Sequence, residues 1–182
     1  MKKFACVIMT LCMIFALGVN ASALQQPTTT IGFPNSYEAA MAMGYDDFLT
    51  ETVTTRGTSV PTTLYDLNTG TYKGFLNNIR TGIYTNYYFY PNSDGKLTFS
   101  WNVRGNKPLD GSSPSWKVLV GVYDIAGGYI KETKEGAWHS DFGSFHDEEL
   151  TFSNLSTSKK YCFFISVYDG ACQIWGDCYV SR

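Results

Sequence analysis

The chain has 182 residues, of which 16% are charged and 16% aromatic, and its formal net charge is −2. This length suits one domain with an ordinary hydrophobic core, and an aromatic-rich chain with few charges is not expected to be disordered. A nucleic-acid partner is excluded because it would require a basic surface.

Residues 1–23 have the pattern of a secretory leader. Two lysines precede an apolar run from Phe4 to Val19, and the small residues 21–23 supply a cleavage site. The run has about 16 residues, short of the roughly 20 that a membrane-spanning helix needs. We therefore expect a signal peptide, a secreted protein, and no membrane span after cleavage.

Residues 24–59 are expected to form an N-terminal arm and one short helix. The Pro- and Thr-containing stretch 24–34 reads as extended. Ser36 or its neighbour Asn35 can cap a helix over 37–43, and Gly44 ends it. The Thr-rich stretch that follows connects to a first edge strand or forms it.

From residue 60 onward, the hydrophobic pattern has a period of two. It is clearest over 96–104, where four apolar residues alternate with polar ones, as in a strand with one buried face. The preceding segment, Asn92–Gly95, is a turn signal that could also bind a structural calcium ion. Further strands are expected at 63–67, 71–79, 87–90, 116–122, 129–133, 148–153, 161–168 and 172–180. Residues 60–182 are therefore predicted to be an all-β antiparallel sandwich or jelly roll.

The order of these strand motifs resembles the bacterial pre-peptidase C-terminal type of β-sandwich over about residues 83–180. The motifs that carry the resemblance are Tyr87-x-Phe89, Gly95-x-Leu97-x-Phe99, Val120-x-Val122-Tyr123-Asp124, Leu155 and Tyr161-x-Phe163-x-Ile165-x-Val167. The resemblance implies a non-enzymatic module of the kind appended to secreted proteases and other exported proteins. It assigns no functional residue.

An odd number of cysteines, three, follows the leader, so at least one is unpaired within the chain. We expect the segments 161–168 and 172–180 to form a hairpin. Its register would place Cys162 opposite Cys178, where a cross-strand disulfide is possible. The alternative is that these two and Cys172 are reduced and pack as small apolar residues.

Both histidines lie between Trp138 and Glu149, a stretch rich in Asp and Glu. Such a stretch could bind a divalent metal or supply an acid–base pair, if a loop brought His139 and His146 together. The alternative is a solvated acidic connection into the next strand. A glycosidase would need two carboxylates about 5–9 Å apart, and the six glutamates are not placed mid-strand as that requires.

The surplus of aromatic residues is the main indication of function. Exposed rings near Asn, Thr and Ser are typical of surfaces that bind sugars, because a ring stacks on the apolar face of a pyranose. The candidate ligand-binding rings, which the alternation leaves on a second face or in a loop, are Tyr88, Tyr90, Trp138, Trp175 and Tyr179. The alternative is that they pack between sheets.

These patterns predict a secreted, non-catalytic module that needs no cofactor and binds a carbohydrate or cell-envelope glycan. One alternative is a protein-interaction or structural accessory domain that meets a cell-surface protein. The other is a small secreted hydrolase of the glycosidase kind.

Overall fold

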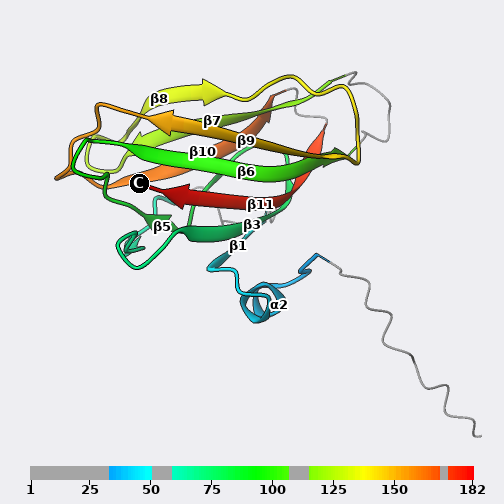
Figure 1. Ribbon diagram of the computed structural model, residues 1–182, viewed down its shortest axis with the longest axis horizontal. Coiled ribbons are helices and arrows are strands. Elements are labelled where there is room, and N and C mark those ends of the chain that lie inside the picture. Colours follow the sequence, from blue (N-terminus) through cyan, green and yellow to red (C-terminus); the bar gives the residue numbers. More distant parts are fainter. Residues whose placement is uncertain (1–32, 51–58, 107–114, 169–171) are drawn as a thin grey trace, which may run out of the picture. The chain divides into compact units, whose positions relative to one another are not determined.

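The structure is a computed structural model, and it describes residues 33–50, 59–106, 115–168 and 172–182 (Figure 1). The expected leader, most of the expected arm and the expected hairpin loop at 169–171 lie outside these residues. The elements are α2 (Tyr37–Ala42), β1 (Asp47–Thr50), β2 (Thr63–Leu64), β3 (Tyr72–Ile79), β4 (Ile83–Tyr84), β5 (Tyr87–Tyr88), β6 (Leu97–Asn106), β7 (Lys117–Asp124), β8 (Tyr129–Glu135), β9 (Phe145–Phe152), β10 (Tyr161–Tyr168) and β11 (Gln173–Ser181). The all-β class predicted from the sequence is confirmed.

The single described helix, α2, forms where its capping residues predict it. The Ser36 hydroxyl accepts a hydrogen bond from the Ala39 amide at 3.2 Å, which satisfies one of the free N–H groups of the first turn. Gly44 follows the helix with a φ of +83°, a conformation that ends helices and favours glycine.

The larger sheet has five strands in the order β1-β3-β11-β6-β9. β1 runs parallel to β3, and the other neighbours are antiparallel. In Figure 1, β6 and β11 run side by side over their whole length, as their register from Gln173–Asn106 to Ser181–Thr98 requires. β1 precedes residue 60, where the sandwich was expected to begin, and nevertheless forms one edge of this sheet.

The second sheet has four strands in the order β4-β10-β7-β8, all antiparallel. A short parallel pair, β2 and β5, forms a third, two-stranded sheet. β9 begins at Phe145, three residues before the expected start at 148, whereas β10 has the predicted bounds.

The core lies between the two sheets. On β6, the apolar members of the alternating pattern are fully buried or nearly so, and their polar neighbours are half-exposed. Phe163 on β10 of the other sheet packs its ring against that of Phe99, with ring centroids 5.1 Å apart. Alternation along the strands therefore identified the inner face correctly.

The predicted hairpin between 161–168 and 172–180 is wrong. β10 pairs with β7 and β4, whereas β11 pairs with β3 and β6, so the two strands belong to different sheets. A period of two shows which face of a strand is buried but not which sheet the strand joins. The register that would place Cys162 opposite Cys178 is absent, and both are buried thiols that form no disulfide among the described residues. Cys172 is also buried.

A smaller apolar cluster covers part of the outer face of the five-stranded sheet. Ala40 of α2, Tyr45 and Phe75 of β3 form its buried centre, and the ring of Trp175 packs against it. This cluster shares Trp175 with the lining of a cavity on the same face.

Candidate functional site

The five rings predicted to bind a ligand do not form one surface but fall into three groups. Tyr88 and Tyr90 contact each other edge to face, with their centroids 5.9 Å apart at 85°. Trp138 contacts Tyr168 in the same manner at 5.4 Å and 88°, and the Lys117 ammonium lies 4.6 Å from the Trp138 ring centre. Neither pair offers the coplanar platform on which a sugar chain would lie.

The structure does bring Trp175 and Tyr179 onto one surface, as the alternation predicted. Both project from the outer face of β11, on either side of Asp177. The Asp177 carboxylate accepts hydrogen bonds from the hydroxyls of Tyr179 at 2.9 Å and Tyr45 at 2.5 Å. Burial, together with this carboxylate, raises the pKa of Tyr179 to about 12, so its hydroxyl stays protonated at neutral pH and remains a donor.

Next to Trp175, the outer face is hollowed by a cavity of about 360 Å³. Its lining combines rings, two carboxamides and a guanidinium, from Phe33, Pro34, Asn35, Asn77, Arg104 and Trp175. The indole Nε1 of Trp175 donates to Asn77 Oδ1 at 2.9 Å. That bond fixes the ring plane of Trp175 at the cavity wall.

Arg104 carries the only charge among the described residues of this lining. Its guanidinium carbon lies 5.0 Å from the ring centre of Phe33, 5.7 Å from Phe145 and 5.9 Å from Trp175. Its Nε is buried without a hydrogen-bond partner among the described residues, and none of their carboxylates forms an ion pair with it. Buried polar groups normally have partners, so within the part of the chain that the structure describes, the positive charge in this cavity lacks an anion.

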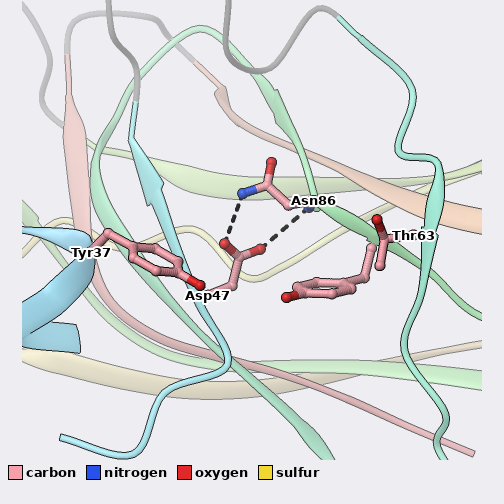
Figure 2. A pocket seen from close by; sticks show the side chains of 5 residues that line it. Tyr37, Asp47, Thr63 and Asn86 are labelled. Atoms are coloured by element: carbon pink, nitrogen blue, oxygen red, sulfur yellow. Dashed lines mark hydrogen bonds between the residues drawn. The ribbon is translucent and has the colours of Figure 1, made fainter. Parts of the chain in front are cut away.

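A second cavity, of about 330 Å³, surrounds a buried carboxylate. Tyr37, Asp47, Thr63, Asn86 and Tyr87 line it. Figure 2 shows Asn86 reaching Asp47 through both its side chain and its backbone, at 2.7 and 3.3 Å. Burial raises the pKa of the Asp47 carboxyl above its usual range, although these hydrogen bonds oppose the shift.

The four hydrogen bonds at Asp47 indicate a structural role for its carboxylate. Besides Asn86, the Phe48 amide and the Tyr72 hydroxyl each donate to it at 2.8 Å. A carboxylate has about four acceptor sites, so the protein itself fills them. This carboxylate joins β1 to β3 and to the segment before β5.

The two histidines lie together, although seven residues separate them in the sequence. Their rings stack with centroids 3.7 Å apart at 27°. His139 Nε2 lies 2.7 Å from Glu148 Oε1, and His146 Nε2 lies 3.1 Å from Asp141 Oδ1. Neither histidine lines either of the two cavities above.

The turn at Asn92 uses its side chain locally. Asn92 Oδ1, the oxygen that could bind calcium, accepts hydrogen bonds from the amides of Asp94 at 3.0 Å and Lys96 at 2.8 Å. These bonds are typical of an asparagine that stabilises a turn.

Sequence reasoning missed most of the residues around Trp175. Arg104 was placed on the polar face of its strand by the alternation, which was a usable signal. Its ring partners and the carboxamides come from distant segments, and the Asn77–Trp175 bond joins residues 98 positions apart. A single sequence does not reveal such a grouping.

No family model matches the sequence, and no curated protein matches it either. Among the described residues, no helix is long and apolar enough to cross a membrane.

Among the solved structures that are similar over part of this chain are the following three. The first is a family GH115 4-O-methyl-α-glucuronidase with specificity for decorated arabinogalactans, with a TM-score of 0.41, 8% identity, and coverage of 70% of this chain and 16% of that one. The second is dimeric latent PorU from Porphyromonas gingivalis, with a TM-score of 0.37, 8% identity, and coverage of 70% and 14%. The third, from infectious bursal disease virus, has a TM-score of 0.28, 12% identity, and coverage of 60% and 30%. The matched regions are minor parts of these proteins, and the resemblance to pre-peptidase C-terminal domains stays a prediction.

Proposed function

We propose that this chain is a secreted, non-catalytic β-sandwich module that binds a glycan containing an acidic sugar in the cavity between Phe33 and Trp175. The observation that carries the proposal is the Arg104 guanidinium, which lines this cavity beside two carboxamides and has no carboxylate partner among the described residues. A uronic acid would supply the missing anion.

The other lining groups match the remaining chemistry of a sugar. The Trp175 indole, held by Asn77, offers an apolar face of fixed orientation on which a pyranose ring can stack. Carboxamides such as that of Asn35 can both donate to and accept from sugar hydroxyls. The planar guanidinium of Arg104 can bind a carboxylate through two parallel hydrogen bonds.

The surface around the cavity is suited to a longer chain of sugars. In the direction of Tyr179, β11 and β6 present the pairs Asp177–Asn102 and Tyr179–Ser100 on neighbouring positions of the sheet. These polar groups follow one another along the outer face, so further sugar units would meet hydroxyl and amide partners. The expected leader supports a location outside the cell, where such glycans are found.

A glycan array with matched acidic and neutral oligosaccharides, followed by titration calorimetry, tests the proposal. Arg104→Gln should weaken binding of the acidic glycan about 10- to 100-fold, because a hydrogen bond to a charged group contributes about 1.5–3 kcal/mol. Arg104→Lys should keep part of the affinity, since it keeps the charge but not the bidentate geometry. Trp175→Ala should weaken acidic and neutral glycans alike.

Tyr129→Ala is the matched control, because Tyr129 is an exposed ring on β8 of the other sheet. It should leave glycan affinity unchanged. The proposal is overturned if the chain binds no glycan, or if Arg104→Gln and Tyr129→Ala bind equally well. Capture of a cell-surface protein without glycan binding would favour the protein-interaction alternative, and release of reducing sugars would favour the hydrolase alternative.

A further inference from the structure

The histidine cluster differs in location and chemistry from the proposed glycan site. One ring nitrogen of His139, one of His146 and a carboxylate oxygen of Asp141 lie within 4.8 Å of one another. Successive side chains of a strand point to opposite faces. His146 therefore faces away from the side of β9 on which Phe145 contacts Arg104.

The polypeptide holds these three residues from rigid positions. The backbone N–H and C=O of His139 both bond to Trp116, each at 2.8 Å. The buried Trp116 indole in turn donates to the Asp141 carbonyl at 3.0 Å. His146 is paired with Val103 within the β6–β9 ladder. Ligands held in this way bind a metal without a large ordering cost.

Glu148 orients the first histidine. Its Oε1 lies 2.7 Å from His139 Nε2, and its Oε2 accepts a hydrogen bond from the Ala137 amide at 2.7 Å. An acceptor at Nε2 places the ring proton there and leaves the lone pair on Nδ1. A carboxylate on the far nitrogen is the common partner of a metal-bound histidine, because it fixes the ring and raises its basicity.

The second histidine has a buried nitrogen that the protein leaves unsatisfied. His146 Nε2 lies 3.1 Å from Asp141 Oδ1, but the contact lacks hydrogen-bond geometry, and no other described residue bonds to this atom. An unpartnered buried nitrogen is costly. Two ligands of one tetrahedral zinc ion, with bonds of 2.0–2.1 Å, are separated by about 3.3 Å. The observed separation of 3.1 Å is close to this value, so both atoms can bind one ion with little movement.

We infer that His139, Asp141 and His146 bind a divalent transition metal ion of the Zn²⁺ type. Two imidazoles and one carboxylate are ligands that suit zinc, copper and nickel, whereas calcium and magnesium take oxygen ligands. A bound ion would tie the segment before β9, which carries His139 and Asp141, to His146 on β9. Its role is independent of the Arg104 cavity.

Titration calorimetry of the purified full chain, without a polyhistidine tag, against Zn²⁺ tests this inference. We expect one zinc ion per chain, an increase in Tm with added zinc, and no response to Ca²⁺ or Mg²⁺. Co²⁺ should give the visible absorption of a low-coordinate nitrogen and oxygen site.

Asp141→Asn is the decisive variant, because 52% of the Asp141 side chain is exposed and its replacement leaves the core intact. Loss of a group that only hydrogen-bonds to a metal ligand lowers metal affinity about 10- to 100-fold. Because Asp141→Asn removes a ligand itself, zinc affinity should fall by more than that. His146→Asn, which removes a nitrogen ligand, should lower zinc affinity at least as much. Asp147→Asn is the matched control, since it removes the same charge from the other face of β9 and should keep zinc affinity.

The inference is overturned if the wild-type chain does not bind zinc, or if Asp141→Asn and Asp147→Asn bind it equally. Either outcome would mean that Trp116 and the two histidines form only an aromatic stack. If His146→Asn fails to fold, the Asp141→Asn comparison still decides the question.

Discussion

Substitution of Gly176 tests how closely β11, the strand that carries Trp175 of the candidate glycan site, packs against β6. The φ of Gly176 is +141°, and a β-carbon there would collide with the Asn102 carbonyl oxygen and lie 2.8 Å from the Val103 Cα. Both atoms are backbone atoms of β6, which pairs with β11 along its length. The register of β11 against β3 also shifts at this point. Gly176→Ala therefore cannot be accommodated by moving a side chain.

The expected cost has two parts. Backbone conformations reserved for glycine cost about 1–3 kcal/mol with another residue, and forced overpacking costs about 1–3 kcal/mol more. Gly176→Ala should thus lower the free energy of unfolding by about 2–6 kcal/mol, a large part of the about 5–15 kcal/mol of a typical domain. Gly70→Ala separates the two parts, because Gly70 has a φ of +152° and no heavy atom within 4 Å of its would-be β-carbon.

Urea unfolding followed by tryptophan fluorescence measures both variants. Gly176→Ala should be less stable than Gly70→Ala by about 1–3 kcal/mol, or about 2–12 °C in Tm for a chain of this size. Equal destabilisation of the two variants would refute the reasoning, since the contact with β6 would then contribute nothing.

Three further predictions concern the core and the buried polar groups. Phe163→Ala should lower the free energy of unfolding by about 3–5 kcal/mol, because its ring meets three other phenylalanine rings in the core; a urea-unfolding cost below about 1 kcal/mol would contradict this packing. The hydrogen bond from Lys159 to the buried Asp124 carboxylate, at 2.6 Å, lowers the pKa of Asp124, so its stabilisation is present above the ordinary Asp pKa and is lost as the pH falls through the lowered value. Tm measured from neutral pH to pH about 2 should then fall less steeply for Asp124→Asn than for the wild type, and parallel curves would count against the ion pair. Burial raises the pKa of the Cys162 thiol to about 12 and that of Cys178 well above its ordinary value, so a thiol reagent should label them only after unfolding and a reductant should leave Tm unchanged.

Local signals in the sequence predicted most of the secondary structure. The Ser36 cap and Gly44 delimited α2, and strict alternation located β6 and its buried face. These features depend on residues within a few positions of one another, which a single sequence displays directly.

The pairing of strands and the candidate site depend on distant residues. The segment 169–171 has a turn signal, yet β10 and β11 enter different sheets. Both strands bury their apolar faces in the same core, so the alternation along each strand does not distinguish this arrangement from a hairpin. Arg104 could be predicted to face outward, but its contacts with Phe33 and Trp175 each span about 70 residues. The loop that was predicted to bring the histidines together is the connection between β8 and β9. The contacts that hold them there, of His139 with Trp116 and of His146 within the β6–β9 ladder, come from distant segments.

The central place of β11 has a consequence for how the protein acquires its structure. β11 is the last of the described strands, yet it lies between β3 and β6, and Cys178 faces Gly74, about one hundred residues earlier in the chain. The two halves of the larger sheet therefore cannot join until residues 173–181 have left the ribosome. Until then β3 and β6 each have an open edge, which can pair with other chains. Such long-range pairing is slow, so the interval before β11 inserts is the stage at which this protein is most exposed to aggregation.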